Sequence, residues 1–475
     1  MKHYKKIIVK KKNVKNHILY LTLLLFSFFS MLLAIFDFSR PRGGYTLLFL
    51  LPFSYILFLV GCKSSWNEIP QNIGLSVLFI LQFIRLVVTP IFLVLGGYHE
   101  VITYKASENT PLASVLMLYE TLWIMLALKI KTKLNIPFVH GIMERKFNRR
   151  MSFLMLLIMA ITAGICFSAP EILQNYRTIA GVFTEADYTS VEQSFIVEAY
   201  ATGFFKKLML VSANYILKVV RILVPTYLLV WSYVKFGKKL RILMLLVVIS
   251  PFLFVDGAIA RSIYFTLFLL LTYDYLFQMN KKKLYAPAIL AGIMVVVYFG
   301  ARYMVISNTI TLTDYISDKL VDYFAGANIV AASFNLPTGL FTRFHYFIGD
   351  ILRAIPFANT LFGLDSGDTS AIFFNAQNMT GGAIPTTIGM GAYYFGVFLA
   401  PVYSFIFALL CKNYGRKYLY AKNPYYRLVY LYISFICALG ITMYNIEITL
   451  ATLVQVIFPI YIVTRLAYPK IKRGD

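Results

Sequence analysis

Long apolar runs alternate with short, mostly basic polar segments along the whole chain. Each run comes close to the roughly 20 residues that an α-helix needs to cross the hydrocarbon core of a bilayer. About twelve such runs are present, at 18–37, 44–61, 73–96, 112–130, 151–169, 210–234, 241–256, 260–278, 284–306, 388–411, 427–444 and 446–466. The pattern predicts an all-α polytopic membrane protein of about twelve transmembrane helices, with residues 1–475 forming a single integral membrane domain.

The basic segments fall in alternate loops between these runs. When the N-terminus is placed in the cytoplasm, every cluster of Lys and Arg falls on the same side, at 1–17, 129–150, 235–241, 281–283, 412–427 and 470–473. Lys and Arg are enriched in cytoplasmic loops of membrane proteins. Both termini are therefore predicted to be cytoplasmic.

Two loops on the opposite, extracytoplasmic side are long, at 170–209 and 307–387. Long loops in compact proteins are usually functional or disordered. These two are rich in Phe, Tyr, Ile and Leu, which argues against disorder. The segment 314–334, for example, is predicted to form further surface or re-entrant helices.

Helical periodicity is clear in the second long loop, over 344–355. Its apolar stripe consists of Phe344, Phe347, Ile348, Ile351 and Ile355. At about 100° per residue, the other side carries Arg343, Tyr346, Asp350 and Arg353, with His345 at the edge of the stripe. A helix at the membrane surface would bury the stripe and present these polar groups to one cavity. Chemistry on a phosphorylated lipid is predicted here.

The composition agrees with a membrane protein and does not indicate a nucleic-acid partner. The chain is 59% hydrophobic, with a mean hydropathy of +0.70 and a net charge of +24. In a soluble domain this charge would indicate nucleic-acid binding. Here the cytoplasmic loops account for it, so no nucleic-acid partner is predicted. The four cysteines form no CxxC pair, which predicts neither a metal site nor a disulfide.

Some ionisable residues fall inside the predicted spans, where a charge is unfavourable unless it faces the protein interior or water. Arg85 and Glu120 are predicted to form a structural pair. Lys218 and Arg221 share a helix face at i, i+3 spacing, either within the span or at its surface. Glu447 follows Asn445 at the start of the last run, where an acidic residue stabilises a helix N-terminus.

Five arginines belong to the outer side, near the two long loops: Arg177, Arg261, Arg302, Arg343 and Arg353. The planar guanidinium binds phosphate oxygens through two parallel hydrogen bonds and stays charged at any working pH. Such a cluster favours an anionic ligand, such as a lipid diphosphate in the outer leaflet. The chain has no GxxxxGK[ST], HExxH or GxSxG motif, so neither a metal nor another cofactor is expected.

Three segments carry a resemblance to a known family: GAIARSIYF (257–265), RFHYFIGDI (343–351) and GGAIPTTIGMGAYYFGVFLAP (381–401). They resemble the bacterial oligosaccharide repeat-unit polymerases of the Wzy type, which make O-antigen, capsule and enterobacterial common antigen. The similarity covers roughly the C-terminal half. It implies a GT-C-like glycosyltransferase architecture in the bacterial cytoplasmic (inner) membrane, with the active site on the outer, periplasmic side.

The resemblance also implies a reaction. A growing chain on undecaprenyl diphosphate is transferred to the non-reducing end of a lipid-linked repeat unit, and no metal or nucleotide is needed. The implied partners are undecaprenyl-diphosphate-linked oligosaccharides, the bilayer, a chain-length regulator and a flippase.

Residue by residue, Arg261 matches the family's arginine after the small-residue turn, and Arg343 matches the loop arginine before the aromatic run. Arg177, in QNYRTIAG, resembles the arginine of the earlier outer loop. Many members of that family have Glu at the position of Met390. If the Glu carboxylate takes part in their reaction, another group must do so in this chain.

The expected site combines these residues. The diphosphate would be bound by Arg261, Arg343, Arg353, Arg302 and Arg177. His345 is the first candidate for the proton acceptor and Asp350 the second, whereas Tyr346 and Tyr176 are expected to stack on sugar faces.

Two other functions remain open. A ligase of similar architecture would transfer finished glycan to a different acceptor. A lipid-linked oligosaccharide flippase also has about twelve spans, but its cationic residues would line a central cavity, and it needs no large outer loops. Arg85, Lys218 and Arg221 fit the flippase, whereas the loop at 307–387 does not.

Overall fold

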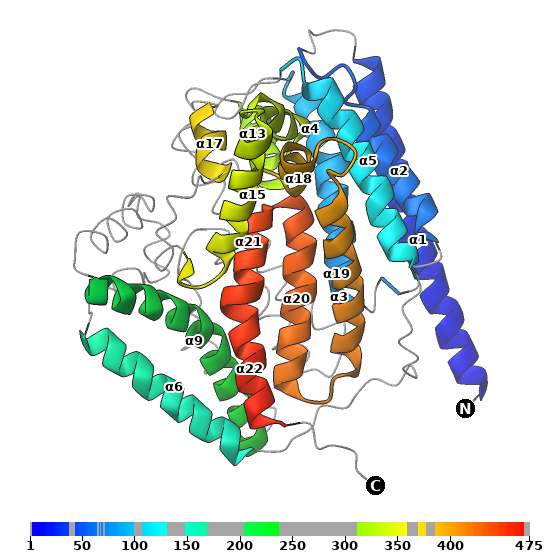
Figure 1. Ribbon diagram of the computed structural model, residues 1–475. Coiled ribbons are helices and arrows are strands. Elements are labelled where there is room, and N and C mark those ends of the chain that lie inside the picture. The colour runs from blue at the N-terminus through cyan, green and yellow to red at the C-terminus, as the bar shows by residue number, and fades with distance from the viewer. Residues whose placement is uncertain are drawn as a thin grey trace.

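The computed structural model describes 2–37, 43–63, 66, 68–69, 72–98, 107–130, 148–168, 204–236, 311–358, 369–376 and 385–469. All regular elements in these ranges are helical (Figure 1). The predicted runs at 241–256, 260–278 and 284–306 and most of the loop at 170–209 lie outside the described residues, whereas 204–209 form the start of α9 (Phe204–Phe236).

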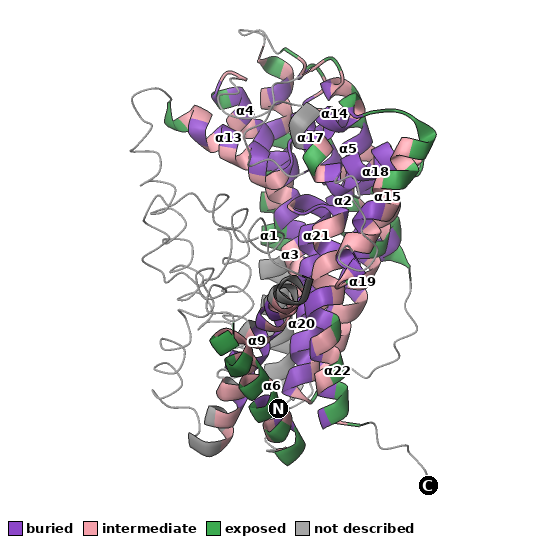
Figure 2. Ribbon diagram, turned by 60° about the vertical axis from the view of Figure 1, so that its left-hand side comes forward, coloured by how far each residue is buried: buried purple, intermediate pink, exposed green. Residues whose placement is uncertain are grey.

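The long helices form a bundle with several layers. It consists of α1 (Lys2–Phe36), α2 (Leu50–Gly61), α3 (Ile73–Phe83), the π-helix η2 (Ile84–Val88), α4 (Thr89–Leu95), α5 (Thr110–Lys129), α6 (Arg149–Ser168), α9 (Phe204–Phe236), α19 (Val402–Tyr420), α20 (Pro424–Thr442), α21 (Ile446–Ala451), the π-helix η6 (Thr452–Ile457) and α22 (Phe458–Ala467). In the described residues, α20 is the most deeply buried span, whereas α6 and α1 lie at the periphery (Figure 2).

Six stretches of the described helices are long and apolar enough to cross a membrane, as expected of a polytopic membrane protein. They are His17–Phe36, Ile73–Leu95, Thr110–Lys129, Arg149–Ser168, Pro424–Thr442 and Ile446–Ala467. Each overlaps a predicted run closely. Two of them contain a turn of π-helix, η2 and η6, which the hydrophobic pattern does not reveal.

The described helices of the second long loop, together with the helix that follows it, gather at one end of the bundle, above α19 to α22 in Figure 1. They are α13 (Leu312–Phe324), α14 (Ala327–Ala332), the 3-10 helix η5 (Ser333–Asn335), α15 (Leu340–Ala354), α17 (Thr369–Ala376) and α18 (Thr387–Phe395). The helices predicted over 314–334 are confirmed as α13, α14 and η5. Because α13 packs on α4 and α14 on α5, these loop helices lie beside the spans and do not project away from them.

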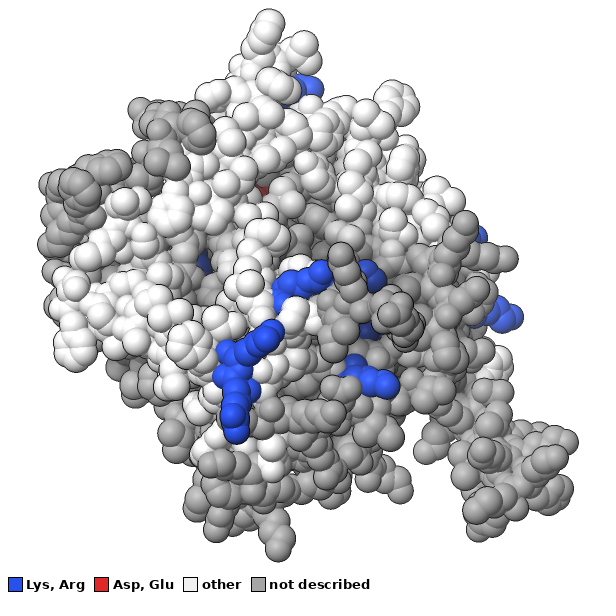
Figure 3. All heavy atoms as spheres, turned by 60° about the horizontal axis from the view of Figure 1, so that its bottom comes forward, with Lys and Arg blue, Asp and Glu red and all other residues white. Residues whose placement is uncertain are grey.

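The opposite end of the bundle is basic. The start of α1, the end of α22 and the connection between α19 and α20 all lie there (Figure 1). Figure 3 shows Lys and Arg side chains gathered on this end, among the described residues. Glu68, a described acidic residue at this end, is ion-paired to Arg416 at 2.6 Å. The described basic segments thus share one end, as the alternation of loops predicts.

The predicted single span at 388–411 is wrong, because the chain turns back within it. Helix α18 ends at Phe395, Gly396 adopts a positive φ of 78°, and α19 begins only after Pro401. The hydropathy stays high through the turn, so composition alone does not mark the break. The span predicted at 44–61 is also shorter than expected, because 43–49 form turns and α2 begins at Leu50.

Gly391 allows the close approach of this turn to α18. A Cβ atom at Gly391 would lie 2.1 Å from the backbone oxygen of Ala400. We expect Gly391→Ala to destabilise the protein by roughly 1–3 kcal/mol, the usual cost of overpacking. The measurement is thermal unfolding in detergent. Gly164→Ala in α6 is the matched control, since a Cβ there meets nothing within 4 Å. Equal losses of stability in the two variants would contradict this account.

Candidate functional site

The helix predicted over 344–355 is confirmed as α15, which begins at Leu340 and ends at Ala354. Its polar side faces the protein, because Asp350 is buried and α15 packs against α21 and α18. Part of its apolar stripe is turned outward, with Phe344 62% and Ile355 44% exposed, whereas Phe347 packs against Tyr394 and Phe395 of α18. In a membrane protein, an exposed apolar stripe of this kind is suited to contact lipid.

Arg343 lies on the inward side of α15 and is half-buried. Its guanidinium lies over the ring of Tyr393 in α18, at 5.9 Å from the ring centre. The Nε atom is buried and has no hydrogen-bond partner among the described residues. An arginine held against an aromatic ring with an unused donor is prepared to bind an anion.

The other two basic residues on the described loop helices are ion-paired. Arg353 lies 3.8 Å from Glu447 at the start of α21. Lys319 in α13 is 3.0 Å from Asp322 and 3.4 Å from Asp318. Burial alone would lower the pKa of Lys319. The two carboxylates raise the pKa by more than burial lowers it, so the pKa lies above its ordinary value. Arg343 is therefore the basic group of these helices that is left for a ligand.

Asp350 lies in a hydrogen-bond network that joins three helices. It is 1% exposed and accepts a short hydrogen bond from the Tyr394 hydroxyl. The backbone N–H of Thr369 donates to its other oxygen at 3.4 Å, and the Thr369 and Tyr394 hydroxyls are 2.9 Å apart. The carboxylate therefore ties α15 to α17 and α18, which favours a positioning role over proton transfer.

For the glycosyl transfer expected from the sequence, we expect Asp350→Asn to lower the rate by less than about tenfold, because loss of a general base would cost about 10²- to 10⁴-fold. The unfolding temperature should fall, since the neutral amide is a weaker acceptor for Tyr394. Turnover and thermal unfolding would be measured together, with His345→Gln alongside. A hundredfold loss of turnover at an unchanged unfolding temperature would instead identify Asp350 as the base.

His345 and Tyr346 lie next to each other at the edge of this site. The His345 ring is exposed and packs edge-on against the Tyr346 ring, with the two ring centres 5.7 Å apart. The ring centres of Tyr346 and Tyr393 are 6.4 Å apart. The imidazole is accessible, as a proton acceptor must be. The structure thus brings together Arg343, His345 and Tyr346 with an aromatic residue, Tyr393, that the sequence did not single out.

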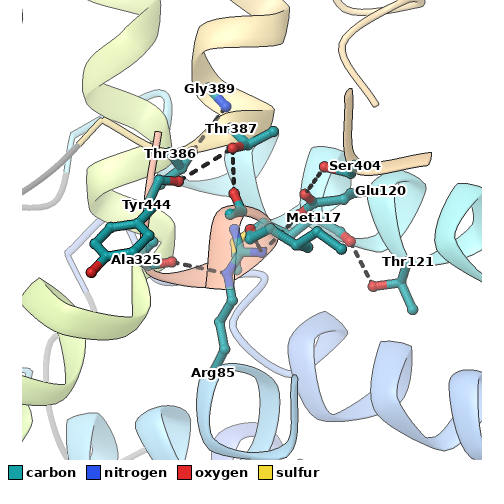
Figure 4. A network of polar contacts seen from close by, with 12 residues as sticks. Arg85, Met117, Glu120, Thr121, Ala325, Thr386, Thr387, Gly389, Ser404 and Tyr444 are labelled. Carbon is teal, nitrogen blue, oxygen red and sulfur yellow. Dashed lines mark hydrogen bonds and ion pairs between the residues drawn. The ribbon is translucent and has the colours of Figure 1, made fainter. Parts of the chain in front are cut away.

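A second polar network lies deep in the bundle (Figure 4). Arg85, in the π-helical turn η2, donates to Glu120 at 2.8 Å and to the backbone oxygens of Ala325 and Ile441 at 3.3 and 3.4 Å. Ser404 also donates to Glu120. The predicted Arg85–Glu120 pair is confirmed, and it joins η2 and α5 to the C-terminal ends of α13 and α20.

The same region anchors α18. The Thr387 hydroxyl donates to the backbone oxygens of Gly440 and Tyr444 at the end of α20. The Thr386 side chain caps the helix by accepting from the N–H of Gly389 at 2.9 Å. The N-terminal end of α18 is therefore held in place by hydrogen bonds, which fixes the positions of Tyr393 and Tyr394 in the same helix. Met390, also in α18, is buried.

Several predicted residues lie outside the described residues: Arg177, Arg261, Arg302 and Tyr176. In α9, Lys218 lies 5.7 Å from the ring centre of Tyr215. Within the described ranges, no three His, Cys, Asp or Glu side chains are grouped to hold a metal ion.

Comparison of the chain with protein-family models, with curated proteins and with solved structures finds no match.

Proposed function

We propose that this protein polymerises undecaprenyl-diphosphate-linked oligosaccharide repeat units into a bacterial surface polysaccharide. The reaction is a metal-independent glycosyl transfer on the outer side of the cytoplasmic membrane. The observation that supports the proposal best is the environment of the Arg343 guanidinium. Arg343 is half-buried over Tyr393, it has no acidic partner among the described residues, and it lies on a helix with exposed apolar residues such as Phe341 and Phe344. A cation in this position suits a lipid whose headgroup is anionic.

The orientation follows from the charge of the two ends. We place the basic end in the cytoplasm, in agreement with the positive-inside rule. The helices α13 to α18 then lie on the outer side, where lipid-linked repeat units are joined. The apolar stripe of α15 would meet the outer leaflet, so the lipid can reach Arg343 without leaving the membrane.

The chemistry fits these groups. An acceptor hydroxyl oxygen attacks the anomeric carbon, the bond from that carbon to the diphosphate oxygen breaks, and the hydroxyl proton passes to a base. Negative charge grows on the leaving diphosphate in the transition state. A fixed guanidinium at Arg343 stabilises that charge more than it stabilises the ground state. His345 is the base that we propose, because its imidazole is accessible.

The flippase is less well supported. Arg85 is 1% exposed and is bonded to Glu120 and two backbone oxygens, so it belongs to the interior and not to a transport path. Lys218 lies against Tyr215. The ligase differs from the polymerase only in its acceptor, and the acceptor must be tested directly.

The test uses purified protein and synthetic repeat units linked to undecaprenyl diphosphate, with products resolved by size. A ladder of multimers is expected for a polymerase. A single transfer to an unrelated acceptor would indicate the ligase. No ladder from folded protein given its cognate unit, together with movement of labelled lipid between leaflets, would favour the flippase and overturn the proposal.

A further inference from the structure

The hydroxyl of Tyr393 is unusual among the buried polar groups of the site. The residue is 4% exposed, yet its hydroxyl has no hydrogen-bond partner among the described residues. Buried tyrosine hydroxyls normally have a partner, because an unsatisfied donor costs free energy. Tyr394, the next residue, shows the ordinary arrangement: its hydroxyl bonds to Asp350 and lies 2.9 Å from that of Thr369.

Tyr393 and Arg343 form a pair of unused donors. The guanidinium lies 5.9 Å from the centre of the Tyr393 ring, and the buried Arg343 Nε likewise has no described partner. The two side chains come from different helices, α18 and α15. A phenol, with an ordinary pKa of about 10, stays protonated at working pH and can donate. Two buried donors on neighbouring side chains, neither with an acceptor among the described residues, indicate an anionic ligand.

The backbone beneath Tyr393 cannot easily move to satisfy this hydroxyl. Thr387 fixes the start of α18 to the end of α20. Gly391 packs directly against the backbone oxygen of Ala400. A side chain that is held on a rigid helix without a hydrogen-bond partner is typical of a binding site whose geometry is set before the ligand binds.

We propose that Tyr393 is the second hydrogen-bond donor to the anionic group that Arg343 binds, a phosphate oxygen of the lipid-linked diphosphate. The identity of this lipid rests on the proposed function, whereas the pairing of the two donors rests on the geometry alone. A phospholipid headgroup carries the same phosphate chemistry, so the experiment must distinguish the two lipids.

The experiment compares Tyr393→Phe with Tyr394→Phe in the purified full-length protein. The two substitutions remove the same atom from neighbouring positions. Thermal unfolding is measured without added lipid, and affinities for undecaprenyl diphosphate and phosphatidylglycerol are measured separately. Tyr393→Phe should unfold at or above the wild-type temperature, because it removes a hydroxyl with no described partner. Tyr394→Phe should unfold at a lower temperature, because Asp350 loses a donor.

Binding gives the decisive result. Tyr393→Phe should weaken affinity for undecaprenyl diphosphate by about ten- to a hundredfold, the range for a hydrogen bond to a charged group. Unchanged affinity would overturn the inference. So would a loss confined to phosphatidylglycerol, since the lipid diphosphate would then not be the ligand. Tyr393-dependent binding of undecaprenyl diphosphate by a protein that makes no polymer would support this inference while refuting the proposed polymerase.

Discussion

Replacing Arg343 with alanine is expected to slow polymer formation by about 10²- to 10³-fold, the usual effect of removing one preorganised donor to a developing negative charge. The folded state should change little. Arg343 is half-buried and its main described contact is the Tyr393 ring, a cation–π interaction of about 0.5–2 kcal/mol. The measurement is the initial rate of multimer formation from synthetic lipid-linked repeat units, with thermal unfolding measured on the same preparation.

Two further variants sharpen this result. Arg343→Lys keeps the charge but loses the planar pair of donors, so an intermediate rate is expected. Arg353→Ala should have a smaller effect than Arg343→Ala, because Arg353 is already ion-paired to Glu447. A wild-type ladder from Arg343→Ala would remove this residue from the reaction and, with it, the observation that carries the proposed function.

The inward side of α15 was predictable from the sequence, because a single helical period separates Arg343, Tyr346 and Asp350 from the apolar stripe. The unsatisfied hydroxyl of Tyr393 was not predictable. Tyr393 and Tyr394 are adjacent and chemically identical, and only the packing of α18 against α15 and α17 decides which hydroxyl bonds to Asp350. The sequence signal was limited to two tyrosines in a segment already noted for its resemblance.

The spans were predictable to the extent that hydropathy follows helix boundaries. The break at Gly396 was missed because apolar residues continue through the turn, so the mean hydropathy does not fall there. The π-helical turn around Arg85 was missed for a related reason, since it leaves composition unchanged. The Arg85–Glu120 pair was predictable, because two opposite charges in apolar spans are strongly unfavourable unless they meet.

Removing the Glu120 carboxylate is expected to destabilise the protein by about 3–5 kcal/mol, the usual effect of breaking one partner of a buried ion pair. Glu120→Ala leaves Arg85 charged and 1% exposed, with only the backbone oxygens of Ala325 and Ile441 as described acceptors. These carbonyl dipoles do not neutralise a full charge. The unfolding temperature in detergent and the yield of folded protein would be measured.

The double variant Arg85→Met with Glu120→Leu separates the buried charge from the lost contacts. Replacing both partners with apolar residues of similar size should restore much of the stability, because no uncompensated charge remains. It should not restore everything, since Arg85 also holds the C-terminal ends of α13 and α20 in place. Thr387, the first residue of α18, is hydrogen-bonded to the same end of α20, so a shift of that end would also move α18 and Tyr393. Stability equal to wild type in Glu120→Ala would show that Arg85 has another source of neutralisation. A stable double variant with weakened binding of undecaprenyl diphosphate would show that this deep pair positions the proposed site on α15 and α18.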